Sequence, residues 1–373
     1  MAPSIALRSA KSNQRMERVE RMTRPRARID GFDQLVGICA YAFDDTLTVP
    51  VPASPAECER LVRLAQRHRV QGLVAAALGE QTPEPLRVQA RAIAVHNLHA
   101  AAESHRLLEA FTKAGIDLLF FKGLTLGALA WPKPMAKMSW DIDVLVNPDS
   151  LIGAAGLLER LGYRRHRPAP AADLPAWHRH TKESEWSLDL AGLQLELHSR
   201  PTENMALLPS IGLDSPRQLV AVKGGAILPT LAPSPLFAYL CVHGATSAWF
   251  RLKWLADLAA LIHRTSAEQT AAWINEAAAS THPRIVGQAM LLTERLFGPM
   301  IPADFVAPFE ADAATRWLAD VAEVELAGPR SMVEPTERRL GTLRIHASQL
   351  RLRPGLGFKA GEAWRQVRES IGR

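Results

Sequence analysis

The sequence has few cysteines and no cysteine pattern. Cys39, Cys58 and Cys241 lie far apart, and none belongs to a CxxC pair. This argues against a disulfide framework and against a cysteine zinc site, and it fits a protein of a reducing cytoplasm. We interpret each cysteine as a small core residue.

Long hydrophobic runs are also absent. No stretch of 18 or more apolar residues occurs, so we expect no membrane span. The first 30 residues lack the apolar core of a secretory signal and carry eight Arg or Lys residues against three acids. We predict a disordered basic leader over residues 1–32 and a cytoplasmic location. A transit peptide is the alternative, but Glu17 and Glu20 weaken it because such segments are poor in acids.

The positive charge of the chain is unevenly distributed. The formal net charge of +6 favours anionic partners such as nucleotides or nucleic acid. Residues 338–373 carry nine basic residues against two acids, the leader is also basic, and the middle of the chain is nearly balanced. Basic ends are weaker evidence for a nucleic-acid surface than a basic stripe on a folded face.

Changes in hydrophobic period divide the chain and predict an α+β fold. Apolar residues three and four apart indicate helices in the N-terminal region, whereas short apolar runs in the centre indicate strands. We predict N-terminal helices over residues 33–115, a mixed β-sheet core over 116–230 and a C-terminal helical region over 231–310. Residues 311–373 are predicted as a helical or partly disordered basic tail, and no internal repeat is evident.

The central region contains the most informative segments. IDLLFF (116–121) is typical of a buried strand and is followed directly by KGLTLGALAW, a glycine turn that opens into a helix. KMSWDIDVLVN (137–147) predicts a second strand. EWSLDL and LQLELH alternate around Ala191-Gly192 and predict a hairpin.

Three acidic residues on these strands are candidate metal ligands. Residues i and i+2 of a strand share a face, so Asp141 and Asp143 are expected to project together. Two close carboxylates repel unless a cation lies between them, and Mg²⁺ (or Mn²⁺) prefers such oxygen ligands. Glu196 faces away from Leu195 and can supply a third carboxylate, with Asp189 as its rival. The alternative is that these acids are solvated at strand ends.

The FFKGLTLGAL segment is a candidate phosphate site. A strand, a glycine and a helix N-terminus place free backbone N–H groups together at Gly123, and Lys122 adds a positive charge. The alternative is a tight strand-to-helix connection with Lys122 in solvent.

The order of these segments resembles that of the nucleotidyltransferase superfamily, whose fold is like that of DNA polymerase beta. Its pattern is a glycine turn, then [DE]-x-[DE], then a single acid on a neighbouring strand. FFKG, KMSWDIDVLV, LERLGY, LELH and CVHGATSAWFRLKWLADLA are similar to motifs of a poorly characterised bacterial branch of that superfamily. Members of that branch occur among natural-product and cell-surface biosynthesis genes. The pattern's usual Gly-Ser turn is Gly123-Leu124 in this chain.

The resemblance implies a Mg²⁺- or Mn²⁺-dependent transfer of NMP from an NTP to a hydroxyl, with release of pyrophosphate. It places two metal ions on Asp141, Asp143 and Glu196, and it makes Glu196 the base for the acceptor. The residues expected to bind the nucleotide are Lys122, Gly123, Thr125 in place of the serine, and Lys137 in place of an arginine. Lys253 and Asp257 either line the cleft or form a surface ion pair, and His243 is a weaker candidate.

Other functions stay open on the sequence alone. A toxin-like enzyme that adds nucleotides to tRNA would use the same chemistry but would need a continuous basic face. A non-catalytic nucleotide-binding or scaffold protein would keep the fold without the reaction. We expect an acceptor that is a small molecule, peptide or protein rather than RNA, and no metal site at His96, His99 and His105, which lack a consistent i, i+4 spacing.

Overall fold

The computed structural model of the chain describes residues 28–189 and 192–371. Most of the predicted basic leader lies outside these ranges, as does Ala191 of the predicted hairpin turn. The helices are α2 (Phe32–Tyr41), α3 (Pro55–His68), α4 (Gln71–Leu78), α5 (Glu84–Lys113), α6 (Leu124–Ala130), α7 (Leu151–Arg160), α8 (Leu174–His178), α9 (Pro233–Thr246), α10 (Leu252–His263), α11 (Ala267–Ser280), α12 (Pro283–Phe297), α13 (Ala303–Ala311), α14 (Ala313–Ala327), α15 (Leu343–Gln349) and α16 (Leu356–Ile371). The strands are β1 (Leu118–Phe120), β2 (Asp141–Val146), β3 (Arg164–Arg167), β4 (Glu183–Leu188), β5 (Leu193–His198), β6 (Arg217–Ala221) and β7 (Ile227–Leu231).

The fold is α+β, as predicted, and several boundaries follow from local sequence signals. Ser54 is the N-cap of α3, and its Oγ accepts a hydrogen bond from the Glu57 backbone N–H at 3.3 Å. The long helix α5 ends just before Gly115, whose φ of 68° is readily adopted by glycine. Among the described helices, none combines the length and the apolar character that crossing a membrane requires.

The central sheet has five strands in the order β1-β2-β5-β4-β3. Strand β2 pairs with β5 in parallel, and the β1–β2, β4–β5 and β3–β4 pairs are antiparallel. The pairing of β4 with β5 confirms the predicted hairpin. Because β2 and β5 are parallel neighbours, the acids of two segments that are distant in the sequence come side by side.

A second hairpin, β6–β7, was missed by the sequence analysis, which assigned no strand between residue 200 and the helices that follow. It pairs residues 217–221 with 227–231 and packs beside β1. Leu219 and Ile227 are exposed apolar residues, so these strands lack the regular alternation of buried apolar and exposed polar residues. The signal that was available is Gly224-Gly225, both with positive φ, at the turn.

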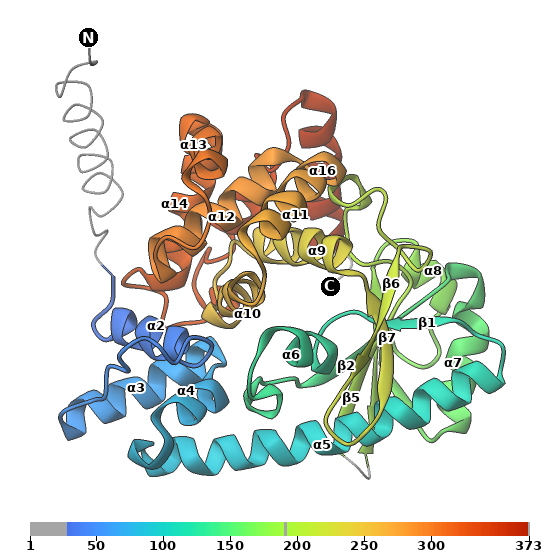
Figure 1. The fold of residues 1–373 in the computed structure, drawn as a ribbon. Coiled ribbons are helices and arrows are strands. Elements are labelled where there is room, and N and C mark those ends of the chain that lie inside the picture. The colour runs from blue at the N-terminus through green and yellow to red at the C-terminus, as the bar shows by residue number, and fades with distance from the viewer. Residues whose placement is uncertain (1–27, 190–191, 372–373) are drawn as a thin grey trace.

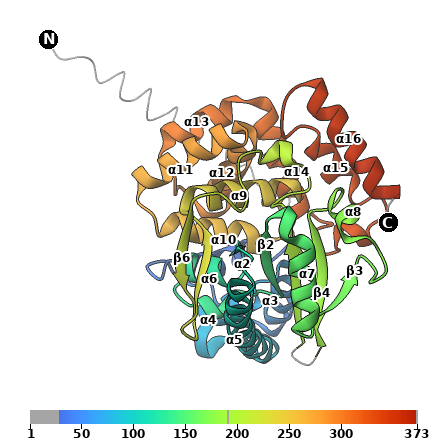
Figure 2. The same ribbon diagram turned by 90° about the vertical axis from the view of Figure 1, so that its right-hand side faces the viewer.

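The sheet separates two apolar cores and leaves the acids in the space between the sheet and the C-terminal helices. Ile142 and Val144 pack with α5 and α7 on one face, whereas Leu145 packs on the other face in the core that includes α9 and α10. Figure 1 shows α5 running beneath the sheet from the N-terminal helices, with the C-terminal helices above the sheet, and Figure 2 shows the same layers from the side. By alternation, Asp141 and Asp143 share the face of Leu145.

Candidate active site

Two of the three predicted acids meet at the centre of the sheet. Asp143 is the register partner of Glu196 across the parallel β2–β5 pair. The Lys122 ammonium lies 2.5 Å from Asp143 Oδ1 and 3.2 Å from Glu196 Oε2. Asp141 lies two residues before Asp143 on the same face of β2. It lines a narrow pocket together with Lys122, Gly123 and Asp143. The cation that meets the acids in this structure is therefore a lysine.

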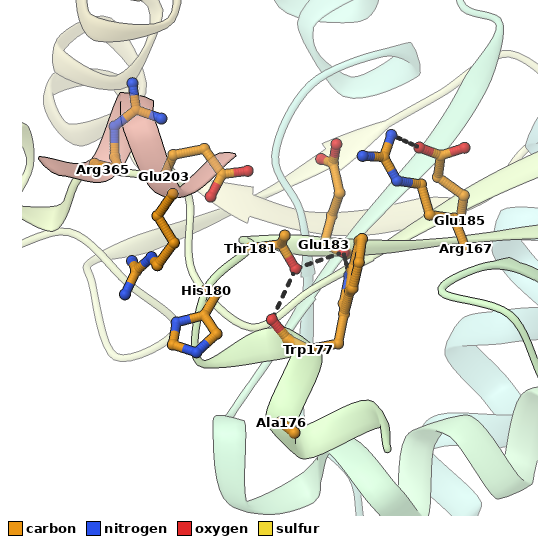
Figure 3. Close-up of a pocket in the computed structure, with 10 residues that line it drawn as sticks. Arg167, Ala176, Trp177, His180, Thr181, Glu183, Glu185, Glu203 and Arg365 are labelled. Carbon is orange, nitrogen blue, oxygen red and sulfur yellow. Dashed lines mark hydrogen bonds and ion pairs between the residues drawn. The ribbon is translucent and has the colours of Figure 1, made fainter. Parts of the chain in front are cut away.

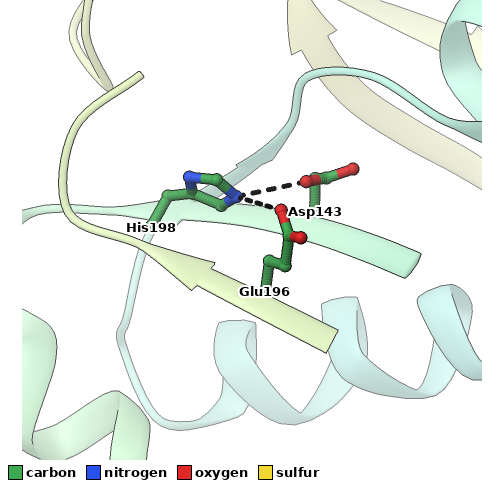
Figure 4. Close-up of side chains that lie close together, drawn as sticks. All are labelled: Asp143, Glu196 and His198. Carbon is green, nitrogen blue, oxygen red and sulfur yellow. Dashed lines mark hydrogen bonds and ion pairs between the residues drawn. The ribbon is translucent and has the colours of Figure 1, made fainter. Parts of the chain in front are cut away.

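His198 completes the cluster, although the sequence analysis gave it no role. Its Nε2 lies 3.1 Å from Asp143 Oδ1 and 3.2 Å from Glu196 Oε2, as Figure 4 shows. The same Nε2 lies 3.4 Å from Glu183 Oε2 on β4. The available signal was the period of two in LQLELH, which places His198 on the face of Glu196.

Burial and charge act on these groups in opposite directions. Burial lowers the pKa of His198 to about 3 and the Lys182 charge contributes, so the imidazole is neutral near pH 7. Despite burial, the Lys122 charge and the contact with His198 lower the pKa of Glu196. Burial raises the pKa of Asp143, and Lys122 offsets this only in part. One ammonium does not neutralise two buried carboxylates that also face Asp141.

The cluster fits a divalent cation. Asp143, Glu196 and His198 each offer one ligand atom, all within 4.8 Å of one another. Asp143 is 3% exposed, yet its Oδ2 has no hydrogen-bond partner among the described residues. A buried carboxylate oxygen without a partner is costly, and a bound cation would remove that cost. Carboxylate oxygens suit Mg²⁺ and Mn²⁺, and imidazole nitrogen suits transition metals.

The turn after β1 requires glycine for conformational reasons. Gly123 has φ 68° and ψ −121°, and it is the N-cap of α6. The buried Thr125 does not take the free position expected of a phosphate-binding serine. Its hydroxyl donates to Phe120 O or Lys122 O, each at 3.2 Å, and so holds the turn together.

Lys253 and Asp257 do not form the surface ion pair considered from the sequence. Asp257 is buried, lies 3.5 Å from Lys137 Nζ and accepts a hydrogen bond of 2.7 Å from Trp131 Nε1. Burial, together with the charges of Lys137 and Arg69, lowers the pKa of Lys253 to about 8. The negative charge of Asp141 acts to raise the pKa of Lys253. We call Arg69, Lys137 and Lys253 the basic cluster.

The remaining candidates make other contacts than with Asp143 and Glu196. Asp189 is exposed and pairs with Arg164 at 3.0 Å. His243 packs between Tyr239 and Trp254. His105 pairs with Glu109 within α5, and His96 contacts Trp140, so the α5 histidines form no ligand group among the described residues.

Comparison with known proteins identifies a family for the chain. No curated protein and no solved structure matches the chain. Residues 54–298 match a family described as an uncharacterised nucleotidyltransferase, and this range includes the acidic cluster, the glycine turn and the basic cluster. The chain belongs to this uncharacterised nucleotidyltransferase family.

Proposed function

We propose that the protein is a metal-dependent nucleotidyltransferase that transfers an NMP from an NTP to a hydroxyl-bearing acceptor and releases pyrophosphate. One observation carries the proposal: Asp143 and Glu196 are opposed across parallel strands, with a buried carboxylate oxygen still unpaired, directly beside the Gly123 turn. The family to which the chain belongs supports the reaction class.

The proposed reaction forms one bond and breaks another. The acceptor hydroxyl loses its proton to Glu196, and its oxygen forms a bond to the α-phosphorus of the NTP. The bond between the α-phosphorus and the bridging oxygen breaks, and pyrophosphate leaves with that electron pair. Lys122 and His198 keep Glu196 ionised, which is the state that a metal ligand or a proton acceptor requires.

Asp141, Asp143 and Glu196 would hold Mg²⁺ or Mn²⁺, which neutralises phosphate charge and polarises the reacting oxygens when bound. His198, as a neutral imidazole, orients Asp143 and Glu196 through its Nε2. With a divalent ion on these carboxylates, Lys122 would be available to contact the phosphates beside Gly123.

The basic cluster is the proposed triphosphate site. Lys253 is half-buried and feels the charge of Asp141, and no carboxylate within ion-pair distance of it is found among the described residues. A polyphosphate is the kind of ligand that offsets three adjacent cations. Lys137, held by Asp257, and Arg69 at the C-terminus of α3 would complete the contacts.

Label transfer tests the proposal. The protein is incubated with each α-³²P-labelled NTP, Mg²⁺ or Mn²⁺, and extracts from its own source. We expect transfer by the wild type and by the exposed control Asp45→Asn, and a loss of about two orders of magnitude or more in Asp143→Asn and Glu196→Gln. Transfer that persists in the Asp143→Asn/Glu196→Gln double variant would overturn the mechanism.

A non-catalytic nucleotide-binding protein is the second candidate, favoured by the Lys122 ion pairs. In such a protein Lys122 would stay between Asp143 and Glu196 and would take the place of a metal ion. In that case neither Mg²⁺ nor Mn²⁺ changes the melting temperature of the protein in the presence of any NTP, whereas the enzyme is stabilised.

A further inference from the structure

A pocket of about 530 Å³ lies on the face of the sheet that carries the acidic cluster, towards β4 and β3. Figure 3 shows Trp177 of α8 in this pocket, with Arg167 and Glu185 on one side and Glu203 and Arg365 on the other. Gly123 lines a narrow pocket with Asp141 and Asp143, on the side of Glu196 where β2 and β1 lie. The pocket therefore lies beyond Glu196, on the other side of the acids.

The strand register connects the pocket to the acidic cluster. Asp143, Glu196, Glu185 and Arg167 are successive partners across β2, β5, β4 and β3, so they form one row on one face. Neighbouring strands are about 5 Å apart, and Glu185 is therefore one strand beyond Glu196. Glu183, which also lines the pocket, contacts the same His198 nitrogen as Glu196.

The charges at the two ends of this row differ. In the basic cluster the positive charges of Lys137 and Arg69 both act on Lys253, and this sum of like charges suits a polyphosphate. The pocket is balanced between acids and bases, so neither a polyanion nor a polycation is favoured there. The charged residues that line the pocket are Arg167, Arg365, Arg368, Glu183, Glu185 and Glu203.

The mixture of donors and acceptors favours hydroxyl groups. A hydroxyl both donates and accepts, so it can bond to a carboxylate and to a guanidinium, whereas a phosphate or an ammonium suits only one of them. Arg167 lies 3.5 Å from Glu185 and stacks 5.4 Å from the centre of the Trp177 ring. Trp177 is half-buried and held by a 2.8 Å hydrogen bond to Glu183 O, so it gives the pocket a fixed apolar wall.

We propose that this pocket, the acceptor pocket, binds the acceptor, and that the acceptor is a ring-shaped polyhydroxylated molecule without net charge, such as a sugar or a cyclitol. The assignment as acceptor site rests on the proposed function, because it requires Glu196 to receive the proton of the bound hydroxyl. The volume fits a ligand of this size.

Saturation-transfer NMR on the full chain, with glucose and myo-inositol as probes, tests the proposal. We expect both probes to bind the wild type, and MgATP to leave them bound because it occupies the other end of the row. Trp177→Ala and Glu185→Gln should each weaken binding of the probes about tenfold. The matched controls are Trp364→Ala and Glu337→Gln, at exposed positions outside the pocket.

Absence of binding by the wild type, unchanged binding in both pocket variants, or displacement of the probes by MgATP would overturn the proposal. The Glu185→Gln variant keeps the size of the side chain, so it covers the case in which Trp177→Ala fails to fold. If none of the four NTPs binds the wild type in the presence of Mg²⁺, the proposed function fails, whereas the result with the two probes stands by itself.

Discussion

Lys122 lies between Asp143 and Glu196 and makes their burial tolerable. Acids on the buried face of a strand need a compensating cation. Here that cation is Lys122, which lies 21 positions before Asp143 in the turn after β1. The sequence analysis expected Lys122 to bind phosphate. Its contact with the acids depends on the antiparallel pairing of β1 with β2, which a local pattern does not reveal.

Replacing Lys122 by methionine should make stability depend on divalent ions. The buried Asp143 and the partly exposed Glu196 lose their partner, which we expect to cost about 3–5 kcal/mol of unfolding free energy in EDTA. Mn²⁺ or Mg²⁺ should raise the melting temperature of this variant more than that of the wild type. The control is Lys133→Met, whose ammonium contacts Ala76 O near the surface. Equal ion effects on Lys122→Met and wild type would contradict a cation role for Lys122.

The N-terminal helices hold the segment that carries Lys137. Asn97 of α5 donates to Met135 O at 3.0 Å and to Lys137 O at 2.8 Å. Helix α4 approaches the same segment so closely that a Cβ on Gly72 would lie 2.1 Å from Ala136 O. The helical period predicted α4 and α5, but their contact with this segment is a tertiary feature.

Substituting Gly72 by alanine should therefore weaken both folding and nucleotide binding. The clash with a backbone oxygen requires α4 and the Lys137 segment to separate, at a cost of about 1–3 kcal/mol. Urea unfolding measures the stability, and the MgATP-dependent rise in melting temperature measures binding. Gly153→Ala on α7 is the matched control, because its Cβ would meet Ile116 Cδ1 at an ordinary 3.5 Å. Normal MgATP stabilisation in Gly72→Ala would contradict the positioning role.

The C-terminal region is a structural part of the molecule. The sequence predicts a helical or partly disordered tail over residues 311–373, and α14, α15 and α16 lie in the described portion. Glu362 of α16 is buried and accepts a 2.6 Å hydrogen bond from Asn204, in the segment after β5. Because α16 also supplies Arg365 and Arg368 to the acceptor pocket, the C-terminal helix and the central residues 167–203 complete one site.

Buried neutral histidines make the free energy of unfolding of the whole molecule depend on pH. Burial lowers the pKa of His68 to about 3 and that of His178 to about 4, below the unfolded value of 6.5. Below pH 6.5 the unfolded chain binds protons that the folded chain does not, so stability rises with pH and is lost as the pH falls. From pH 7 to pH 5, His68 alone should cost about 2 kcal/mol.

Urea unfolding at both pH values measures this loss. His68→Gln should reduce the difference between pH 7 and pH 5, although it also removes the acceptor for the Leu252 backbone N–H. His105→Gln, at an exposed position on α5, is the control. An equal reduction in both variants would contradict burial as the cause.

The sequence by itself determined the local features. The period of two put Asp141 and Asp143 on one face of β2 and Glu196 on one face of β5, because alternation is a property of a single strand. Only the tertiary structure decided which partners these acids meet. The register of β2 and β5 places Asp143 opposite Glu196. Asp257 lies within ion-pair distance of Lys137, not of Lys253. Residues of α8 and α16 line one pocket beside the sheet. These contacts link segments far apart in the chain, and no local periodicity encodes them.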